Sequence, residues 1–411
     1  MPRALAYSSR MASPSRDGVY HRKSDTGWAG NGVDRVFCGA DMIHRPNIRD
    51  LSLPEIEALI ASLGKEKYRA RQIMKWLYQT GATSFAEMTT LARDFRAALE
   101  ERFIIAEPSF NRIQTSVDGT KKALFRLSDG CGVESVLIPG RNHWTACIST
   151  QAGCAMGCRF CLTGKQGLKR NLLPSEITGQ MTMLRRQTPE GPEIKNIVLM
   201  GMGEPLANYD HTVKSIRILT SDFGLGFSNR KITVSTCGLA PQIVQLGKDV
   251  CVNLAISLNA PDDRRRNDLM PINRKYPLAT LLRVCRDYPM PGRRMLTFEY
   301  TLMAGVNDSR KDAEQLSRLL KGLHCKLNLI AFNEFPGAPF RPPAPETISA
   351  FQQVLLDHHY TAILRASHGR DILAACGQLS GEGSEPPSGG RELPSCDPVP
   401  AENEAFPAGS C

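Results

Sequence analysis

Short apolar runs alternate with longer amphipathic stretches along the chain from about residue 111 onward. The apolar runs are rich in β-branched and aromatic residues and predict strands at 123–127, 132–138, 145–150, 196–200, 231–236, 251–258, 296–302 and 326–332. Between the later runs, apolar positions recur at helical spacing and predict helices that include 174–187, 209–220, 277–287 and 310–320. This alternation predicts an α/β fold with a parallel sheet and right-handed crossovers.

A different pattern precedes the sheet region. Ser52-Leu53-Pro54-Glu55 has the form of a capping box, and Gly64 is positioned to end the helix that begins there. Two further helices are predicted at 68–78 and 95–103. We therefore predict a small helical accessory domain at 46–108 and an α/β core at 109–379. The flanking residues 1–45 and 380–411 lack a hydrophobic period and are predicted to be disordered.

The composition is that of a globular chain: 42% of the 411 residues are hydrophobic and 22% are charged. No apolar run approaches the ~20 residues that a membrane-spanning helix needs. Thirteen cysteines in a chain without a visible secretory signal predict a reducing compartment, and hence the cytoplasm. The net charge is +10, and residues 380–411 contribute about −5 to it, so the remainder is strongly basic. Such a charge favours a nucleic-acid partner, although a basic protein without one has the same composition.

Three cysteines, Cys154, Cys158 and Cys161, are spaced C-x3-C-x2-C. Three thiolates at this spacing can hold three irons of a [4Fe–4S] cluster, and the fourth iron is left open to bind a substrate. The alternative is structural zinc, which usually takes four ligands in two pairs, and the sequence has no second pair of that kind. A disulfide framework is not expected in a chain of this length without a secretory signal. The motif therefore favours chemistry at an open cluster.

Small polar residues follow several of the predicted strands. Two glycines and an acid come after the strand at 196–200, in Gly201-Met202-Gly203-Glu204-Pro205. Three later strands end in short polar stretches, which are Ser235-Thr236-Cys237-Gly238, Ser257-Leu258-Asn259 and Ala331-Phe332-Asn333. Because the carboxyl ends of parallel strands meet at one edge of a sheet, these residues predict a pocket for a polar small molecule beside the cluster.

These features resemble the radical S-adenosylmethionine (SAM) superfamily and, within it, the RlmN family. The closer resemblance is carried by CISTQAGC at 147–154, NL at 171–172, GMGEPL at 201–206, LMPINRKYP at 269–277 and AACGQL at 374–379, and it extends from about Ile48 to Gly381. It implies a partial (β/α)6 radical-SAM barrel with a small N-terminal helical domain. It also implies an enzyme that methylates C2 of adenosine in 23S ribosomal RNA and transfer RNA, with a [4Fe–4S] cluster and two SAM molecules per turnover.

The resemblance assigns roles to individual residues. Cys376 accepts a methyl group and becomes the S-methylcysteine intermediate, Cys147 resolves the product through a transient disulfide with Cys376, and Glu134 is the proton acceptor. The cluster ligands are Cys154, Cys158 and Cys161. The family's SAM contacts correspond to Gly203, Glu204, Ser235, Ser257, Leu258, Asn259 and Asn333. The implied partners are the two RNA substrates and a protein that reduces the cluster and the disulfide, with no membrane and a monomeric enzyme.

Two other functions remain open from the sequence. The first is an RNA methyltransferase of the Cfr type, which modifies C8 of adenosine and shares the cluster, both outlying cysteines and the SAM site. The segment 271–277 and the position of Glu134, thirteen residues before Cys147, favour C2. The second is a non-catalytic iron–sulfur or zinc protein that binds RNA. Basic clusters that could meet phosphates, or could be solvated surface, are Arg264-Arg265-Arg266, Lys165 with Lys169-Arg170, and Arg293-Arg294.

Overall fold

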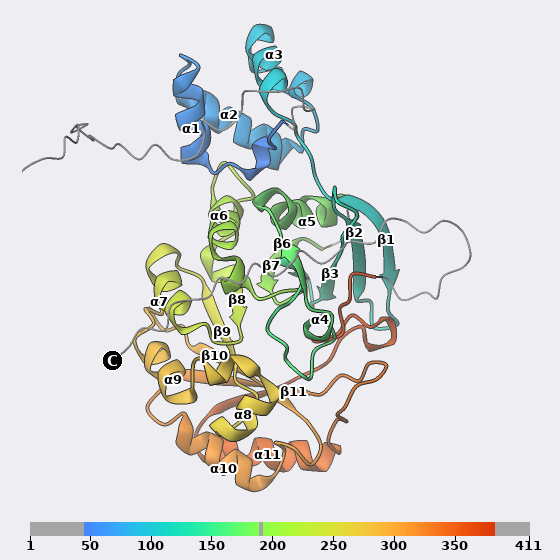
Figure 1. Cartoon of the computed structure of the whole chain (residues 1–411), viewed down its shortest axis with the longest axis vertical. Coiled ribbons are helices and arrows are strands. Elements are labelled where there is room, and N and C mark those ends of the chain that lie inside the picture. Colours follow the sequence, from blue (N-terminus) through green and yellow to red (C-terminus); the bar gives the residue numbers. More distant parts are fainter. Residues whose placement is uncertain (1–44, 189–191, 383–411) are drawn as a thin grey trace, which may run out of the picture. The chain divides into compact units, whose positions relative to one another are not determined.

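The structure is a computed structural model that describes residues 45–188 and 192–382 (Figure 1). The described residues form one compact unit. The predictions of disorder concern residues 1–45 and 380–411, of which 1–44 and 383–411 lie outside the described residues. The division into an accessory domain at 46–108 and a core at 109–379 stays a prediction.

Helices make up the first part of the described chain. They are α1 (Leu53–Ser62), α2 (Tyr68–Lys75) and α3 (Arg93–Arg102), with short helical turns at Ile48–Asp50, Trp76–Thr80 and Phe85–Glu87. The capping box is present: the Glu55 carboxylate accepts hydrogen bonds from the Ser52 backbone N–H at 2.7 Å and from its hydroxyl at 2.6 Å. The helix predicted at 68–78 is divided, because its second half is a π turn that ends at Gly81 with φ of 77°.

Ten strands form one mixed sheet in the order β1-β2-β3-β4-β7-β8-β9-β10-β11-β12. The first three pair antiparallel, and β4 joins them to a run in which every neighbouring pair is parallel. The strands are β1 (Ser109–Thr115), β2 (Lys121–Arg126), β3 (Gly132–Pro139), β4 (Trp144–Cys147), β7 (Ile194–Leu199), β8 (Ile232–Thr236), β9 (Asn253–Ser257), β10 (Leu296–Leu302), β11 (Cys325–Ala331) and β12 (Thr361–Arg365). A separate ladder joins β5 (Gln151–Gly153) to β6 (Leu168–Asn171).

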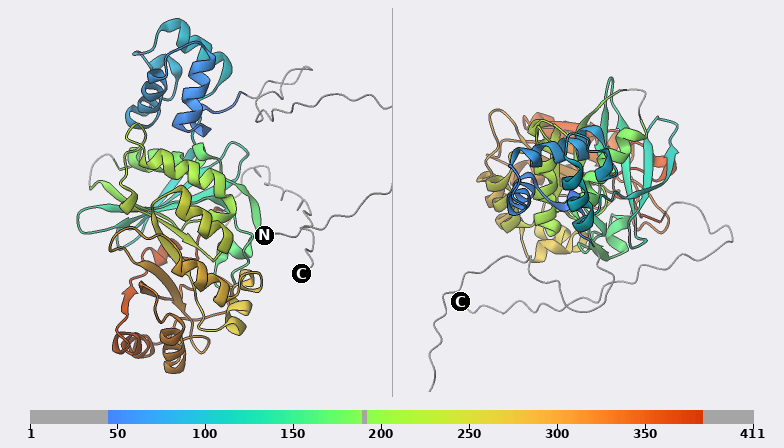
Figure 2. Two further views of the ribbon diagram at one scale, coloured as in Figure 1. Left: turned by 90° about the vertical axis from the view of Figure 1, so that its left-hand side faces the viewer. Right: turned by 90° about the horizontal axis from the view of Figure 1, so that it is seen from above.

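Helical crossovers connect the parallel strands. They are α5 (Pro174–Arg186), α6 (Tyr209–Thr220), α7 (Ala240–Asp249), the pair α8 (Asp263–Leu269) and α9 (Leu278–Arg286), α10 (Arg310–Leu319) and α11 (Pro345–Asp357). Because consecutive strands are neighbours in the sheet, right-handed crossovers place these helices on one face of it. Figures 1 and 2 show them outside the strands. The described chain thus contains six successive βα units, and the predicted partial (β/α)6 barrel is confirmed.

The remaining short helices lie at strand ends and in loops. They are α4 (Leu162–Lys165) and 3-10 turns at Pro205–Asn208, Asn229–Lys231, Pro271–Arg274 and Arg370–Ile372. Within the part of the chain that the structure describes, no helix is long and apolar enough to cross a membrane.

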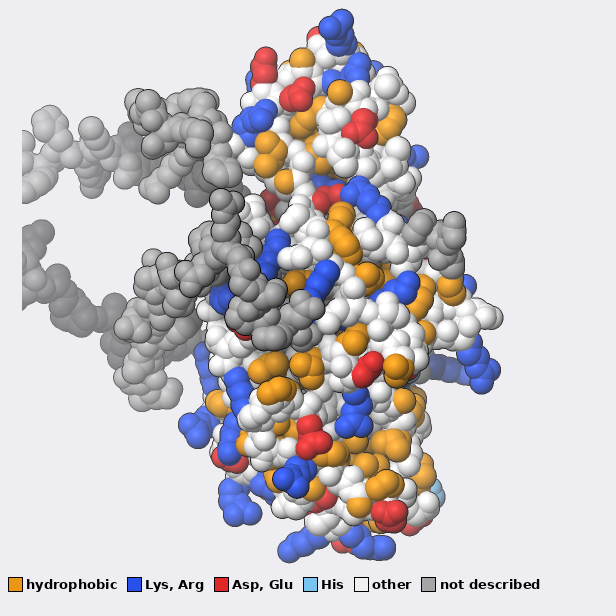
Figure 3. Space-filling view, turned by 90° about the vertical axis from the view of Figure 1, so that its right-hand side faces the viewer, with side chains coloured by type: hydrophobic (Ala, Val, Ile, Leu, Met, Phe, Trp, Pro, Cys, Tyr) orange, Lys and Arg blue, Asp and Glu red, His pale blue; other side chains and the backbone are white. Residues whose placement is uncertain are grey.

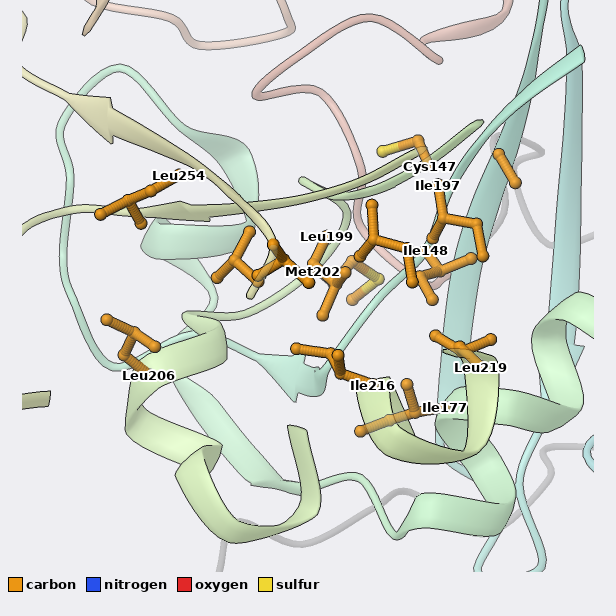
Figure 4. Close-up of a cluster of buried hydrophobic side chains, with 14 of the residues drawn as sticks. Cys147, Ile148, Ile177, Ile197, Leu199, Met202, Leu206, Ile216, Leu219 and Leu254 are labelled. Carbon is orange, nitrogen blue, oxygen red and sulfur yellow. The ribbon is translucent and has the colours of Figure 1, made fainter. Parts of the chain in front are cut away.

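The core lies between the sheet and its crossover helices. Ile197 and Leu199 of β7 pack with Ile177 of α5 and Ile216 of α6, and each of these side chains is at most 1% exposed (Figure 4). Full burial of one such side chain contributes roughly 1.5–3 kcal/mol. Cys147 lies at one edge of this cluster (Figure 4). The apolar core therefore fixes the strand ends on which the predicted site residues stand.

Candidate active site

The carboxyl ends of the parallel strands enclose a cavity of about 380 Å³. It is lined by most of the residues that the sequence singles out, which are Cys147, Cys154, Cys158, Cys161, Gly203, Glu204, Ser235, Ser257, Asn259, Asn333 and Cys376. Leu258 and Glu134 do not line it, and both are fully buried. Residues that are more than 200 positions apart in the sequence therefore meet at one place, as the rule for parallel α/β sheets requires.

The three clustered cysteines lie on the loop between β5 and α4. The Cys154 N–H donates to the Gly167 carbonyl at 2.8 Å, and the Cys161 N–H donates to the Cys158 carbonyl at 3.1 Å. Gly153, just before the motif, has φ of 76°, and a Cβ there would lie 2.0 Å from the Gly167 oxygen. Only glycine fits this close approach, so the sequence Gly153-Cys154 is needed to start the loop.

The surroundings of these thiols oppose ionisation. Burial, with smaller contributions from the neighbouring Cys161 and Glu204, raises the pKa of Cys154 to about 12. Burial is also the largest cause of the raised pKa values of Cys158 and Cys161. Thiolates at this loop therefore need a bound cationic group, because the metal ligand is the thiolate and not the thiol.

The donor set fits a [4Fe–4S] cluster with three protein ligands. Within residues 45–188 and 192–382, no three His, Cys, Asp or Glu side chains are arranged to hold a single metal ion. A cluster does not need that arrangement, because its thiolates bind different iron atoms. The three thiols line one cavity, and the charges of Cys154 and Cys161 both act on Cys158.

The loop after β7 packs against the chain that leads into the cysteine motif. Gly203 has φ of 98°, and a Cβ there would lie 2.5 Å from Gln151 Cβ and 2.7 Å from the Gln151 nitrogen. The Glu204 carboxylate accepts the backbone N–H groups of Leu206 at 3.0 Å and of Cys237 at 2.8 Å. Burial raises the pKa of Glu204, and these hydrogen bonds lower it. Glu204 therefore joins the end of β7 to the end of β8 in the cavity wall.

Two further strand-end residues are held by side-chain hydrogen bonds to β10. The Ser235 hydroxyl donates to Glu299 Oε2 at 2.9 Å. Asn259 adopts φ of 58°, and its side-chain oxygen accepts the Thr301 N–H at 2.8 Å. Part of the hydrogen-bonding capacity of these residues is thus used within the protein, which fixes their orientation at the cavity.

Asn333 offers an unused acceptor. Its Nδ2 donates to the Cys376 carbonyl at 3.2 Å, whereas its Oδ1 is buried without a hydrogen-bond partner among the described residues. A buried acceptor without a donor costs free energy of about 1–3 kcal/mol. A ligand with amino groups, such as SAM, would satisfy it, so the residues present fit this cofactor.

The two outlying cysteines face the same cavity. Cys147 ends β4 and is 6% exposed, and Cys376 lies in the segment after the turn at Arg370–Ile372. Both are free thiols. The Cys376 side chain is open to the cavity, yet the surrounding protein removes water from it and raises its pKa to about 12. Burial raises the pKa of Cys147, and the nearby charge of Cys376 raises it further. The two sulfurs are therefore close enough to interact electrostatically.

Glu134 is placed differently from the other predicted residues. It lies on β3, and its Oε2 accepts the backbone N–H groups of Ser380 at 2.8 Å and Gly381 at 3.2 Å. Its Oε1 lies 3.1 Å from Lys122 Nζ. The structure does not bring Glu134 into the cavity, and its role as a proton acceptor stays a prediction.

Comparison with known proteins identifies the family. The chain is 68% identical over 343 residues to the dual-specificity RNA methyltransferase RlmN of Syntrophus aciditrophicus. This match covers 84% of this chain and 99% of that protein. It is 53% identical to the RlmN of Geobacter sulfurreducens over 84% of this chain and 96% of that protein. The chain belongs to the RlmN family.

Further comparisons agree with this assignment. Residues 46–105 match the ribosomal RNA large subunit methyltransferase N-terminal domain, and residues 148–317 match the radical SAM superfamily. The crystal structure of a radical SAM methyltransferase from Sphaerobacter thermophilus superposes with a TM-score of 0.76 at 44% identity, and covers 82% of this chain and all of that one. This RlmN-family protein is therefore a radical SAM RNA methyltransferase, and members of that superfamily use a [4Fe–4S] cluster and SAM.

Sequence reasoning missed two charged residues at the RlmN site, one half-buried and one fully buried. Glu299 on β10 lines the cavity, and its charge raises the pKa values of both Cys147 and Cys376. Arg266 is fully buried and donates to carbonyl groups at the ends of β8 and β9. The one available signal for Glu299 was an acid in an otherwise uncharged strand, LTFEYTL at 296–302.

Two of the three predicted basic clusters are partly engaged within the protein. For Arg264-Arg265-Arg266 the prediction of a surface cluster was wrong, because Arg266 is buried and Arg265 pairs with Asp262 and Asp312. Arg170 pairs with Asp129 and Glu176. Lys and Arg side chains are scattered over the face shown in Figure 3.

The third cluster lies away from the cavity. Arg293 and Arg294 line an open hollow of about 940 Å³ that also includes Arg230 and Cys251. These residues precede β8, β9 and β10, so the hollow lies at the amino ends of the strands and not at the carboxyl ends. It contains none of the predicted site residues.

Proposed function

We propose that this RlmN-family enzyme methylates C2 of adenosine in 23S ribosomal RNA and in transfer RNA. The supporting observation is that Cys147 and Cys376, from distant parts of the sequence, line one cavity with the three clustered cysteines. An ordinary methyltransferase needs no such pair of thiols. We further propose that it acts as a monomer in the cytoplasm and consumes two SAM molecules per turnover.

The three clustered cysteines and the two outlying cysteines have different tasks in this proposal. Cys154, Cys158 and Cys161 hold the cluster, and Gly203, Glu204, Ser235, Ser257, Leu258, Asn259 and Asn333 bind SAM. When bound, the cluster and SAM supply a 5′-deoxyadenosyl radical, which is the chemistry that protein side chains lack. The adenine carbon C2 is electron-poor and does not attack a methyl donor as a nitrogen or oxygen nucleophile would. A methyl group carried on protein sulfur solves this problem.

The sulfur chemistry balances in three steps. Cys376 loses its thiol proton and takes a methyl group from the first SAM. After hydrogen abstraction from that methyl group, its carbon would bond to C2, Glu134 would accept the C2 proton, and the remaining unpaired electron would return to the oxidised cluster. Cys147 then loses its proton and attacks the Cys376 sulfur, so that a disulfide forms and the bond from that sulfur to the methylene carbon breaks. The carbon takes up a proton, and the methylated base is released. A reductant protein supplies two electrons to restore both thiols. The disulfide requires the two Cα atoms to come within about 4.4–6.8 Å.

The substrate position is tested by nucleoside analysis of RNA from a deletion strain. Loss of 2-methyladenosine from both ribosomal and transfer RNA is expected. Loss of 8-methyladenosine with 2-methyladenosine intact would instead assign a Cfr-type reaction.

The cysteine roles are tested with purified variants. Cys376→Ala should contain the cluster but carry no S-methyl group, as measured by peptide mass. Cys147→Ala should accumulate a covalent adduct between protein and RNA. Cys251→Ala is the matched control, because Cys251 is exposed and lies outside the cavity. Release of free product by Cys147→Ala would refute its resolving role.

A further inference from the structure

The segment from Gly369 to Gly381, which carries Cys376, is held mainly by contacts with other parts of the protein. Its only described helical turn is at Arg370–Ile372. At its start, the Gly369 N–H donates to Asp118 Oδ2 at 3.0 Å. Point contacts of this kind can be released one by one, unlike the continuous ladder of a strand.

The end of this segment is held by a buried ion pair. Glu134 Oε2 accepts the N–H groups of Ser380 and Gly381, and Glu134 Oε1 lies 3.1 Å from Lys122 Nζ. Lys122 is 3% exposed and Glu134 is not exposed at all. Glu134 Oε1 has no well-directed hydrogen bond among the described residues, so its contact with Lys122 is mainly electrostatic. Lys122 Nζ also lies 3.4 Å from the Leu373 carbonyl, within the same segment.

The sheet explains why these two charges meet. On the antiparallel strands β2 and β3, Leu124 lies opposite Glu134, and Lys122 lies opposite Val136. Lys122 and Glu134 are therefore diagonal neighbours on one face of the sheet, within reach of long side chains. Each buried charge depends on the other, because an unpaired charge in the interior is strongly unfavourable.

This arrangement restricts what Glu134 can do while the segment is in place. A proton acceptor must come within hydrogen-bond reach of the proton that it takes. Glu134 is outside the cavity, and its oxygens are engaged by two segment amides and one ammonium group. Glu134 therefore cannot accept a proton from a substrate in the cavity while Ser380 and Gly381 are bonded to it.

We propose that Lys122 and Glu134 form a latch that holds the Cys376 segment in the cavity wall, and that Glu134 becomes available when Ser380 and Gly381 are released. Lys122 is thereby a positioning residue that acts through Glu134. The inference rests on the proposed role of Cys376 as methyl carrier. It couples movement of the methyl-bearing cysteine to exposure of the carboxylate.

Hydrogen exchange of the full-length protein tests the latch. In Lys122→Met, amide exchange in a peptide covering 374–382 should rise about tenfold, because the hydrogen bonds from Ser380 and Gly381 to Glu134 open more often. Peptides from β10 (Leu296–Leu302) should be unchanged. Lys121→Met is the matched control, since Lys121 is the next residue on β2 and its ammonium lies 5.6 Å from the Trp144 ring instead. Lys122→Arg retains the charge and should restore slow exchange.

A second variant separates a local effect on the segment from unfolding of the whole protein. Lys122→Met leaves Glu134 unpaired and could unfold the protein, whereas the double variant Lys122→Met with Glu134→Leu removes both charges. The double variant should show the same local increase at 374–382. Equal exchange in the double variant, Lys121→Met and the wild type would overturn the proposal. Because these measurements use protein without RNA, their failure is distinguishable from failure of the proposed methylation.

Discussion

Replacement of Arg266 by Met tests the site's most buried cation. Arg266 is completely buried, and its guanidinium donates to the Leu258 carbonyl at 3.0 Å, the Ser257 carbonyl at 3.1 Å and the Cys237 carbonyl at 2.7 Å. A fourth hydrogen bond reaches Asn273 Oδ1 at 2.8 Å. The side chain therefore ties the ends of β8 and β9 to the turn after α8. Methionine keeps much of the volume and removes every donor.

The expected loss of stability can be estimated from these contacts. A hydrogen bond from a charged donor contributes about 1.5–3 kcal/mol, so four such bonds would sum to ~6–12 kcal/mol. Burial of a cation costs several kcal/mol, and the contacts described for Arg266 are to carbonyl and amide oxygens. The net loss expected for Arg266→Met is therefore ~3–5 kcal/mol, comparable to the breaking of a buried ion pair. The total stability of a domain is only about 5–15 kcal/mol.

Thermal unfolding and SAM binding provide the assay. The Tm of Arg266→Met should fall by roughly 5–10 °C. Its affinity for SAM should fall at least about tenfold, because the Ser257 carbonyl is no longer held. The control is Arg264→Met on the same helix, where the side chain is exposed and the change should stay within about 0.5 kcal/mol. Equal Tm values for the two variants would refute the reasoning.

Three further outcomes are expected. Gly203→Ala should abolish SAM binding, as measured by equilibrium dialysis. The alanine Cβ would lie 2.5 Å from Gln151 Cβ, and the φ of 98° is strained for alanine. Normal SAM binding by this variant would contradict the reasoning. Burial alone would raise the pKa of Asp118, but hydrogen bonds that include the one from the Gly369 N–H lower this pKa below 3.8. The ionised Asp118 therefore stabilises the folded protein above pH 3.8, and this stabilisation is lost as the pH falls. Asp118→Asn should therefore show a smaller fall in the urea midpoint between about pH 5 and 3 than the wild type, and identical falls would argue against it. Cys158→Ala should lose bound iron and visible absorbance, and a full iron content would exclude it as a ligand.

Regular, well-buried elements of the fold were predictable from the sequence. The strand at 296–302 and the helix at 209–220 have the predicted bounds, because apolar residues mark their buried faces clearly. The edge strands β1 and β12 were missed. β1 is SFNRIQT, with a largely polar composition, and four of the five residues of β12 are exposed. An edge strand buries little surface and therefore leaves a weak hydrophobic pattern.

The site divides in the same way. The three clustered cysteines and the Gly203-Glu204 loop could be singled out from local spacing, whereas Cys147 and Cys376 were singled out only by resemblance to the family. Arg266 and Glu299 were not, because a charged residue that bonds within the protein looks the same in the sequence as a solvated one until its partners are known. Glu134 illustrates the difficulty, since the amides that engage it are 246 and 247 residues away. Long-range pairing of this kind leaves no periodic signal along the chain.

The unequal anchoring of Cys147 and Cys376 bears on the disulfide proposed between them. Cys147 is paired with Val136 on one side and Val198 on the other, so its backbone is fixed in the sheet. Cys376 is held through single contacts, such as the hydrogen bond from the Leu162 N–H to the Gly377 carbonyl at 2.7 Å. The proposed disulfide between them would therefore form by movement of Cys376 toward Cys147, whose backbone is fixed in the sheet. Because Leu162 directly follows Cys161, this movement would break a contact with the loop that carries the three clustered cysteines.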